Sequence, residues 1–100
     1  MDITVQELKT KLDAKEEFLF IDVREMHEFE EFNLGAKLIP LGDFMMALPE
    51  MEGYKKDEVV IHCRSGKRSA MAQHLMKEAG FENVRNLTGG VLAWQEAFGS

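Results

Sequence analysis

One short stretch of the sequence combines a nucleophile with several positive charges. Cys63 is the only cysteine of the chain, and the five residues after it include three cations and a glycine. These five residues are Arg64, Ser65, Gly66, Lys67 and Arg68. Converging backbone N–H groups and nearby cations favour a thiolate over a thiol. We therefore predict that Cys63 lies at the mouth of a cationic loop, has a lowered pKa and acts as a nucleophile.

A lone cysteine can also be a small apolar core residue, and that structural role is the alternative. The three cations and the glycine favour the functional interpretation, because a core cysteine has no use for them. Neither nearby histidine suits a general base. His62 precedes Cys63 on a strand and points to the opposite face, whereas His74 lies well into the next helix. We expect the loop, and not a histidine, to activate the thiol.

The residues on either side of the loop predict how the chain positions it. The β-branched run Val59–Ile61 is typical of a parallel strand covered on both faces. Apolar residues at helical spacing predict a helix behind the loop that runs to about Ala79 and ends at Gly80. Cys63 is thus predicted where a buried strand passes into a helix N-terminus, a usual ligand position in open α/β sheets.

Strand and helix patterns alternate along the rest of the chain. Thr4 and Glu7 form the capping-box signature of a first helix. Further strands are predicted at 18–23, within 34–41 and at 84–87, and further helices at 25–32 and after the turn at 88–90. Asp43 is expected to cap another helix that ends near Pro49. Gly89 and Gly90 lack the fuller phosphate-binding fingerprint, so we interpret them as a packing turn.

Two charged residues occur at the end of the strand predicted at 18–23. Asp22 interrupts an apolar run, and Arg24 follows two positions later. A buried carboxylate needs a partner, which Arg24 could supply. The pair either braces or borders the Cys63 pocket or is an ordinary structural ion pair, and the sequence leaves both possibilities open.

Length and composition narrow the class of protein. The 100 residues fit one domain, residues 1–100, and the net charge of −6 argues against a nucleic-acid or anionic-membrane partner. The longest apolar run, Phe44–Leu48, is far too short to cross a membrane, and Met1–Thr4 resembles no leader, so a cytoplasmic location is expected. One cysteine excludes an internal disulfide and a cysteine-rich zinc site. Cations gathered on an acidic chain suggest a small anion as ligand.

Several motifs together resemble the rhodanese family of sulfurtransferases. They occur in the order typical of that family and extend from about Phe18 to Phe98. The motifs are Asp22-Val23-Arg24-Glu25 with Phe29, Gly35-Ala36, Ile39-Pro40, Cys63-Arg64-Ser65-Gly66-Lys67-Arg68-Ser69, Ala79-Gly80-Phe81 with Val84, and Leu87-Thr88-Gly89-Gly90 with Trp94.

The resemblance implies an α/β fold in three layers, with a central, mostly parallel sheet of four to five strands flanked by helices. It also implies that Cys63 takes a sulfane sulfur from thiosulfate or a persulfide donor and passes it to a thiol or cyanide. N–H groups from Arg64 to Arg68 would hydrogen-bond the transferred sulfur. Arg64 and Lys67 suit the oxygens of thiosulfate, while Arg68 would do the same or brace the loop. The reaction requires no cofactor and no metal.

Without a second cysteine, the persulfide cannot be resolved internally, so the acceptor is expected to be an external thiol or a protein of a persulfide relay. Two other functions remain as alternatives. Cysteine phosphatases and arsenate reductases close a similar loop with an arginine six positions after the cysteine, whereas Arg68 follows Cys63 by five. The shorter loop favours a single sulfur atom over a tetrahedral phosphate. A non-catalytic rhodanese-like binding module is the other alternative.

Overall fold

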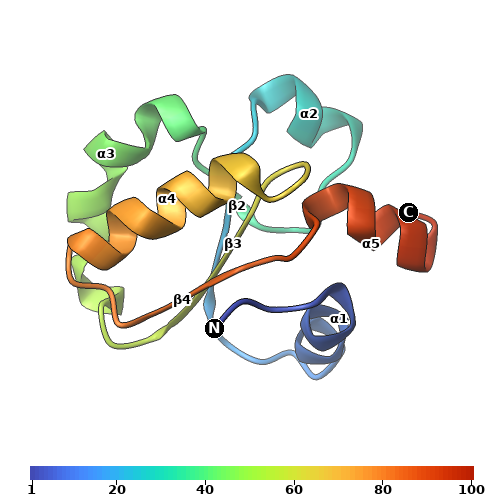
Figure 1. Ribbon diagram of the computed structural model, residues 1–100, viewed down its shortest axis with the longest axis horizontal. Coiled ribbons are helices and arrows are strands. Elements are labelled where there is room, and N and C mark those ends of the chain that lie inside the picture. Colours follow the sequence, from blue (N-terminus) through green and yellow to red (C-terminus); the bar gives the residue numbers. More distant parts are fainter.

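The strands of this protein form one sheet between two layers of helices (Figure 1). The computed structural model describes all of residues 1–100. In chain order its elements are α1 (Val5–Asp13), β1 (Leu19–Asp22), α2 (Met26–Glu31), β2 (Lys37–Leu38), the 3-10 turn η1 (Leu41–Asp43), α3 (Phe44–Ala47), the 3-10 helix η2 (Leu48–Tyr54), β3 (Glu58–His62), α4 (Lys67–Glu78), β4 (Asn83–Asn86) and α5 (Gly90–Phe98). None of these helices is long and apolar enough to cross a membrane.

The sheet is parallel throughout, with the strand order β2-β1-β3-β4. Asp22 of β1 pairs with His62 of β3, and Ile61 pairs with Asn86 of β4. The carboxyl ends of these three strands therefore lie at one edge of the sheet. Ile3 adds a parallel bridge to Leu87, beyond the end of β4. The predicted α/β fold with four to five mostly parallel strands is confirmed.

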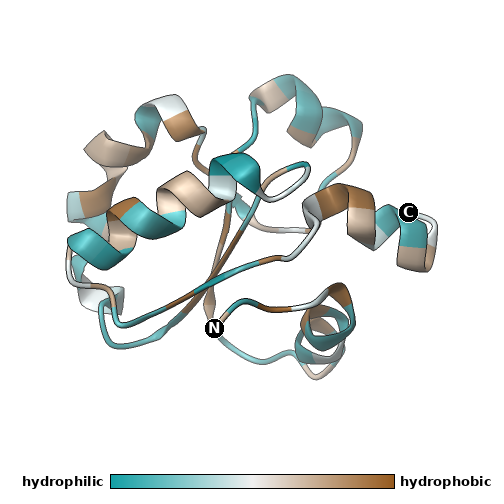
Figure 2. Ribbon diagram, in the orientation of Figure 1, coloured by the Kyte–Doolittle hydropathy of each residue, from teal (hydrophilic) through white to brown (hydrophobic).

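Two apolar clusters divide the core between the faces of the sheet. Along β3, Val59 and Ile61 pack with residues of α3, η2 and α4 on one face. Val60 packs on the other face with residues of α1 and α5. Figure 2 shows brown, hydrophobic segments on the central strands and mixed colours along the helices, as expected where each helix turns an apolar stripe inward. This alternation gives the three layers.

Local signals at the helix ends produce the predicted boundaries. The Glu7 N–H donates to Thr4 Oγ1 at 3.1 Å, and the Thr4 N–H donates to Glu7 Oε1 at 2.9 Å, which completes the capping box. Helix α4 ends just before Gly80, whose φ of +100° is in the left-handed region.

The segment after Asp43 matches the prediction in part. Helix α3 begins directly after Asp43 and ends at Ala47, two residues before Pro49, but the Asp43 side chain makes no capping hydrogen bond. The chain then continues as the 3-10 helix η2 to Tyr54, with Pro49 in its first turn. Proline is compatible with the first turn of a helix, where its missing N–H has no partner to lose. Burial of Leu48 and Met51 in the core favours this continuation.

The turn before α5 packs closely against the loop that follows Cys63. The Val91 N–H donates to the Cys63 carbonyl at 3.0 Å, and the Leu92 N–H donates to the Arg64 carbonyl at 3.0 Å. A Cβ on Gly90 would lie 2.5 Å from the Cys63 carbonyl oxygen. The first amides of α5 are therefore used by the loop, which agrees with a packing turn and not a phosphate site.

Gly90→Ala should lower the free energy of unfolding by about 3 kcal/mol, because it combines a left-handed φ with a backbone clash. Gly35→Ala is the matched control, since Gly35 has a φ of +88° but no atom within 4 Å of an added Cβ. The control should lose about 1 kcal/mol from φ strain alone. Urea unfolding measures both variants, and equal losses would contradict the close approach of α5.

Candidate active site

Cys63 lies between the end of β3 and the start of α4, with its sulfur beneath the intervening loop. Its Sγ accepts hydrogen bonds from the Gly66 N–H at 3.1 Å and the Ser69 N–H at 3.4 Å. The Ser69 hydroxyl oxygen is 3.3 Å from the same sulfur. The predicted convergence of loop donors on the sulfur is therefore present.

The position of Cys63 at the mouth of the loop is a wrong prediction. Only 1% of the residue is exposed, and it belongs to the apolar cluster on the α4 face of the sheet. Two groups that face the sulfur, the N–H and the hydroxyl of Ser69, lie within the first turn of α4. The sulfur is thus buried but supplied with polar partners.

The environment of the sulfur shifts its acidity in the predicted direction. Burial raises the pKa of the Cys63 thiol, but hydrogen bonds from the Ser69 hydroxyl and from the amides of Ser69, Gly66 and Ser65 outweigh this effect. The net result is a pKa below the ordinary value of 9.0. The main lowering groups are hydrogen-bond donors of the loop and helix, and not the cationic side chains.

Gly66 and Asn86 give the loop its shape. Gly66 precedes α4 with a φ of +103°, a conformation that turns its N–H toward the sulfur. The Gly66 carbonyl accepts a hydrogen bond from Asn86 Nδ2 at 3.1 Å, and the Ser69 hydroxyl lies 2.6 Å from Asn86 Oδ1. Asn86 and Ser69 were not predicted as site residues. A polar residue at the carboxyl end of the strand beside β3 was the available signal for Asn86.

The three cations of the loop differ in their surroundings. Arg68 is paired with Glu28 of α2 through two contacts of 2.7 and 2.9 Å. Arg64 and Lys67 are exposed, and no carboxylate lies within 4.0 Å of either. Of the two roles left open for Arg68, this geometry favours bracing the loop. Arg64 and Lys67 are free to meet an anion.

The Asp22–Arg24 pair fixes α2 to the end of β1. Arg24 Nη2 lies 2.8 Å from Asp22 Oδ2 and donates to the Phe32 carbonyl at 2.6 Å, while Nη1 donates to the Glu28 carbonyl at 3.3 Å. Both members of the pair are nearly inaccessible to solvent. The pair is a structural clamp, and it also borders the site because Arg24 lines a cavity next to the loop.

His62 lies on the opposite face from Cys63, as predicted. Its ring packs against Phe20, with the ring centroids 5.5 Å apart. Burial lowers the pKa of His62 despite an opposing effect of Asp22, whose Oδ2 is 3.7 Å from Nε2. The neutral imidazole is thus a core side chain and is not placed to deprotonate Cys63.

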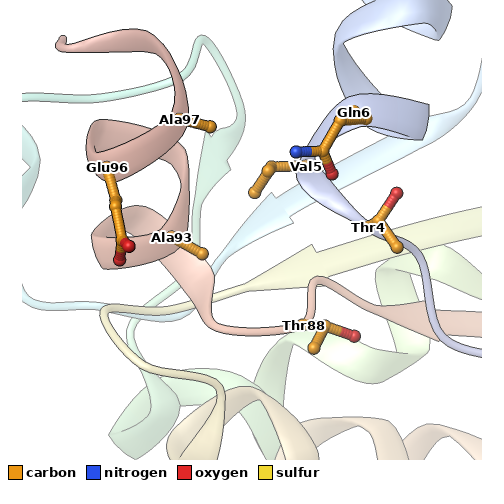
Figure 3. Close-up of a pocket in the computed structure, with 7 residues that line it drawn as sticks. All are labelled: Thr4, Val5, Gln6, Thr88, Ala93, Glu96 and Ala97. Atoms are coloured by element: carbon orange, nitrogen blue, oxygen red, sulfur yellow. The ribbon is translucent and has the colours of Figure 1, made fainter.

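Two cavities differ in their suitability for a small anion. A cavity of about 120 Å³ lies beside the loop, and its charged lining residues are two arginines and two glutamates, Arg24, Arg64, Glu28 and Glu31. A wider hollow of about 440 Å³ lies between α1 and α5 (Figure 3). It is lined by Thr4, Val5, Gln6, Thr88, Ala93, Glu96 and Ala97. Its one charged side chain is acidic, whereas the smaller cavity includes two cations, one of which is the unpaired Arg64.

Comparison with known proteins identifies the family. Residues 4–97 match the Rhodanese-like domain family, and the chain belongs to it. The Bacillus subtilis protein named "Putative sulfurtransferase YtwF" is 41% identical over 97 residues, covering 94% of this chain and 89% of that protein. Another Bacillus subtilis relative, named "Putative sulfur carrier protein YrkF", is 37% identical over 94 residues, and these cover 93% of this chain but 50% of the relative.

Solved structures agree with this assignment. The human single-domain sulfurtransferase TSTD1 has a TM-score of 0.81 and 26% identity, with 95% of each chain covered. A rhodanese-like domain protein from Staphylococcus aureus has a TM-score of 0.76 and 32% identity, covering 94% of this chain and 91% of that one. The fold and the sulfurtransferase family predicted from the sequence motifs are confirmed.

The Glu28–Arg68 pair predicts an acid-dependent loss of stability. Hydrogen bonds from Arg68 lower the pKa of Glu28 from 4.5 to about 2. The unfolded chain therefore binds the proton first as the pH falls, so the stabilisation is complete above about pH 4.5 and is lost toward pH 2. Glu28→Gln should cost about 1 kcal/mol at pH 7 and progressively less through this window.

Urea unfolding at a series of pH values measures this difference. Asp13→Asn is the control, because it removes a carboxylate from the exposed Lys9–Asp13 pair, which should contribute little. A Glu28→Gln deficit that persists unchanged at pH 2 would contradict an ionic origin.

Proposed function

We propose that this rhodanese-family protein transfers a sulfane sulfur through a persulfide on Cys63. The observation that carries the proposal is the set of donors that converges on one buried sulfur from Gly66 and Ser69. Two exposed, unpaired cations, Arg64 and Lys67, stand on the same loop. This combination suits a thiolate nucleophile whose substrate is a small sulfur-containing anion.

In the first half-reaction the Cys63 thiolate attacks the outer sulfur of thiosulfate. A sulfur–sulfur bond forms to Sγ as the sulfur–sulfur bond of thiosulfate breaks, and sulfite leaves with the bonding electron pair. The products are the Cys63 persulfide anion and sulfite, so charge and atoms balance. Arg64 and Lys67 bind the sulfonate oxygens, and the loop amides stabilise the transferred sulfur.

In the second half-reaction an external thiolate or cyanide attacks the outer sulfur of the persulfide. The new bond forms at that sulfur, and the electron pair of the broken bond returns to Cys63 Sγ as a thiolate. Cys63 is the only cysteine in the sequence, so the acceptor comes from outside this chain.

The burial of Cys63 narrows the class of donors. Because the residue is 1% exposed, a donor that presents one terminal sulfur atom fits better than a bulky group. Thiosulfate and a persulfide both meet this condition. The names of the relatives support a sulfur relay, since one is called a sulfur carrier and another from Zea mays an adenylyltransferase and sulfurtransferase. This chain spans 20% of that longer protein.

Incubation of the reduced protein with thiosulfate should add the mass of one sulfur atom, as measured by intact-protein mass spectrometry. Cyanide should remove the added mass and release thiocyanate, because it attacks the outer sulfur of the persulfide. Cys63→Ser is the matched control and should gain nothing.

Release of phosphate from an aryl phosphate, without any gain of sulfur, would instead favour the phosphatase alternative. If neither reaction occurs with the reduced protein, the alternative of a binding module of the same family remains.

Arg64→Ala should raise the Michaelis constant for thiosulfate roughly tenfold with little change in kcat, because a charge-assisted contact to the bound donor is lost. Lys77→Ala, in the last turn of α4, removes one positive charge away from the loop and controls for net charge. Steady-state kinetics at fixed ionic strength compare the two variants. Equal Michaelis constants would show that Arg64 does not contact the donor.

A further inference from the structure

The Ser69 hydroxyl has one proton and two acceptors within reach. Its oxygen is 2.6 Å from Asn86 Oδ1 and 3.3 Å from Cys63 Sγ. A hydroxyl donates one hydrogen bond at a time. The proton therefore points either to the asparagine or to the sulfur, and the shorter distance favours the asparagine while the sulfur is uncharged.

The orientation of the Asn86 amide leaves no other arrangement. Asn86 Nδ2 donates to the Gly66 carbonyl at 3.1 Å. Reversing the amide would place Oδ1 against that carbonyl, where two acceptors would face each other without a proton between them. Oδ1 is thus held toward Ser69. Ser69 is fully buried and Asn86 is 7% exposed, so water does not readily replace either partner.

We propose that Asn86 is a positioning residue that directs the proton of the Ser69 hydroxyl according to the charge on Cys63. While the sulfur is a thiol or a persulfide, Ser69 donates to Asn86 Oδ1. When the sulfur becomes a thiolate, the hydroxyl turns about its Cβ–Oγ bond and donates to Sγ. No heavy atom needs to move, because both acceptors are already within hydrogen-bonding distance.

The effect of this proton switch on sulfur transfer depends on the proposed function, in which Cys63 carries the transferred sulfur. When an acceptor takes the outer sulfur, the electron pair of the broken bond returns to Sγ, and Ser69 then donates to the leaving thiolate. Asn86 Oδ1 loses its donor at that moment, and this loss opposes the gain at the sulfur. Asn86 thus limits how far Ser69 stabilises the thiolate, which preserves its nucleophilicity for the next donor.

Other charged groups around Cys63 are the same in every variant needed for the test. Arg68 is held by Glu28, the neutral His62 ends β3, and the Asp22–Arg24 pair lies at the end of β1. Exposed Arg64 and Lys67 stand on the loop itself. A change of thiol titration on substituting Ser69 or Asn86 therefore reports on the hydrogen bonds to the sulfur.

A double-mutant cycle tests the proposal. The thiolate is titrated by ultraviolet absorbance and by the rate of iodoacetamide alkylation as a function of pH. The four proteins are the unaltered chain, Ser69→Ala, Asn86→Ala and the double variant. At pH values below the titration midpoint, Ser69→Ala should slow alkylation roughly tenfold, because the thiolate loses a hydrogen bond.

Asn86→Ala should speed alkylation and lower the titration midpoint when Ser69 is present, and should change neither when residue 69 is alanine. The cycle cancels the loss of the Asn86 contact with the Gly66 carbonyl, since that loss is common to both backgrounds. Slower alkylation, no change, or the same change in both backgrounds would overturn the proposal. The titration needs no sulfur donor, so it remains informative if thiosulfate fails to load Cys63.

Two further variants distinguish the loss of a hydrogen bond from a defect in folding. Ser69→Thr keeps the hydroxyl and should restore alkylation close to that of the unaltered chain, which a purely structural role for Ser69 would not require. If Asn86→Ala unfolds, Asn86→Ser replaces it in the cycle, because its shorter side chain cannot place an acceptor at the position of Oδ1. Thermal unfolding of every variant establishes which of them are folded.

Discussion

A buried thiolate needs hydrogen-bond donors around it. In this structure the elements next to Cys63 are arranged to supply them. Burial alone raises the pKa of Cys63, and the donors of Ser69 and Gly66 reverse the effect. These donors act only if the chain turns sharply between β3 and α4. The left-handed Gly66 supplies the turn, and the first turn of α4 brings Ser69 to the sulfur.

Contacts from three distant segments of the chain hold this turn in place. Asn86 at the end of β4 binds the Gly66 carbonyl, and the first amides of α5 bind the Cys63 and Arg64 carbonyls. From α2, Glu28 binds Arg68, and α2 is itself fixed to β1 by the Asp22–Arg24 pair. Each contact uses a polar group at the carboxyl edge of the sheet. This edge is where the parallel topology gathers the ends of β1, β3 and β4.

The same arrangement gives the charged residues of the loop different roles. Arg68 is needed to hold the loop and is neutralised by Glu28, whereas Arg64 and Lys67 remain exposed and unpaired. Two unpaired cations thus remain on the loop that follows the one thiol of a protein with a net charge of −6. The helix-lined hollow between α1 and α5 has no comparable charge and lies on the other face of the sheet (Figure 3).

Local signals in the sequence determined the position of the site and most elements of the fold. The β-branched run before Cys63, the Thr4–Glu7 capping box and Gly80 act over a few residues, so their effects can be read without a structure. The sequence did not reveal the 3-10 helix η2 that follows α3, because the burial of Leu48 and Met51 in the core favours that continuation. Only the tertiary structure decided the burial of Cys63, the Ser69–Asn86 contact across 17 residues and the Glu28–Arg68 pair across 40. Such contacts depend on how separate elements pack, which no local pattern encodes.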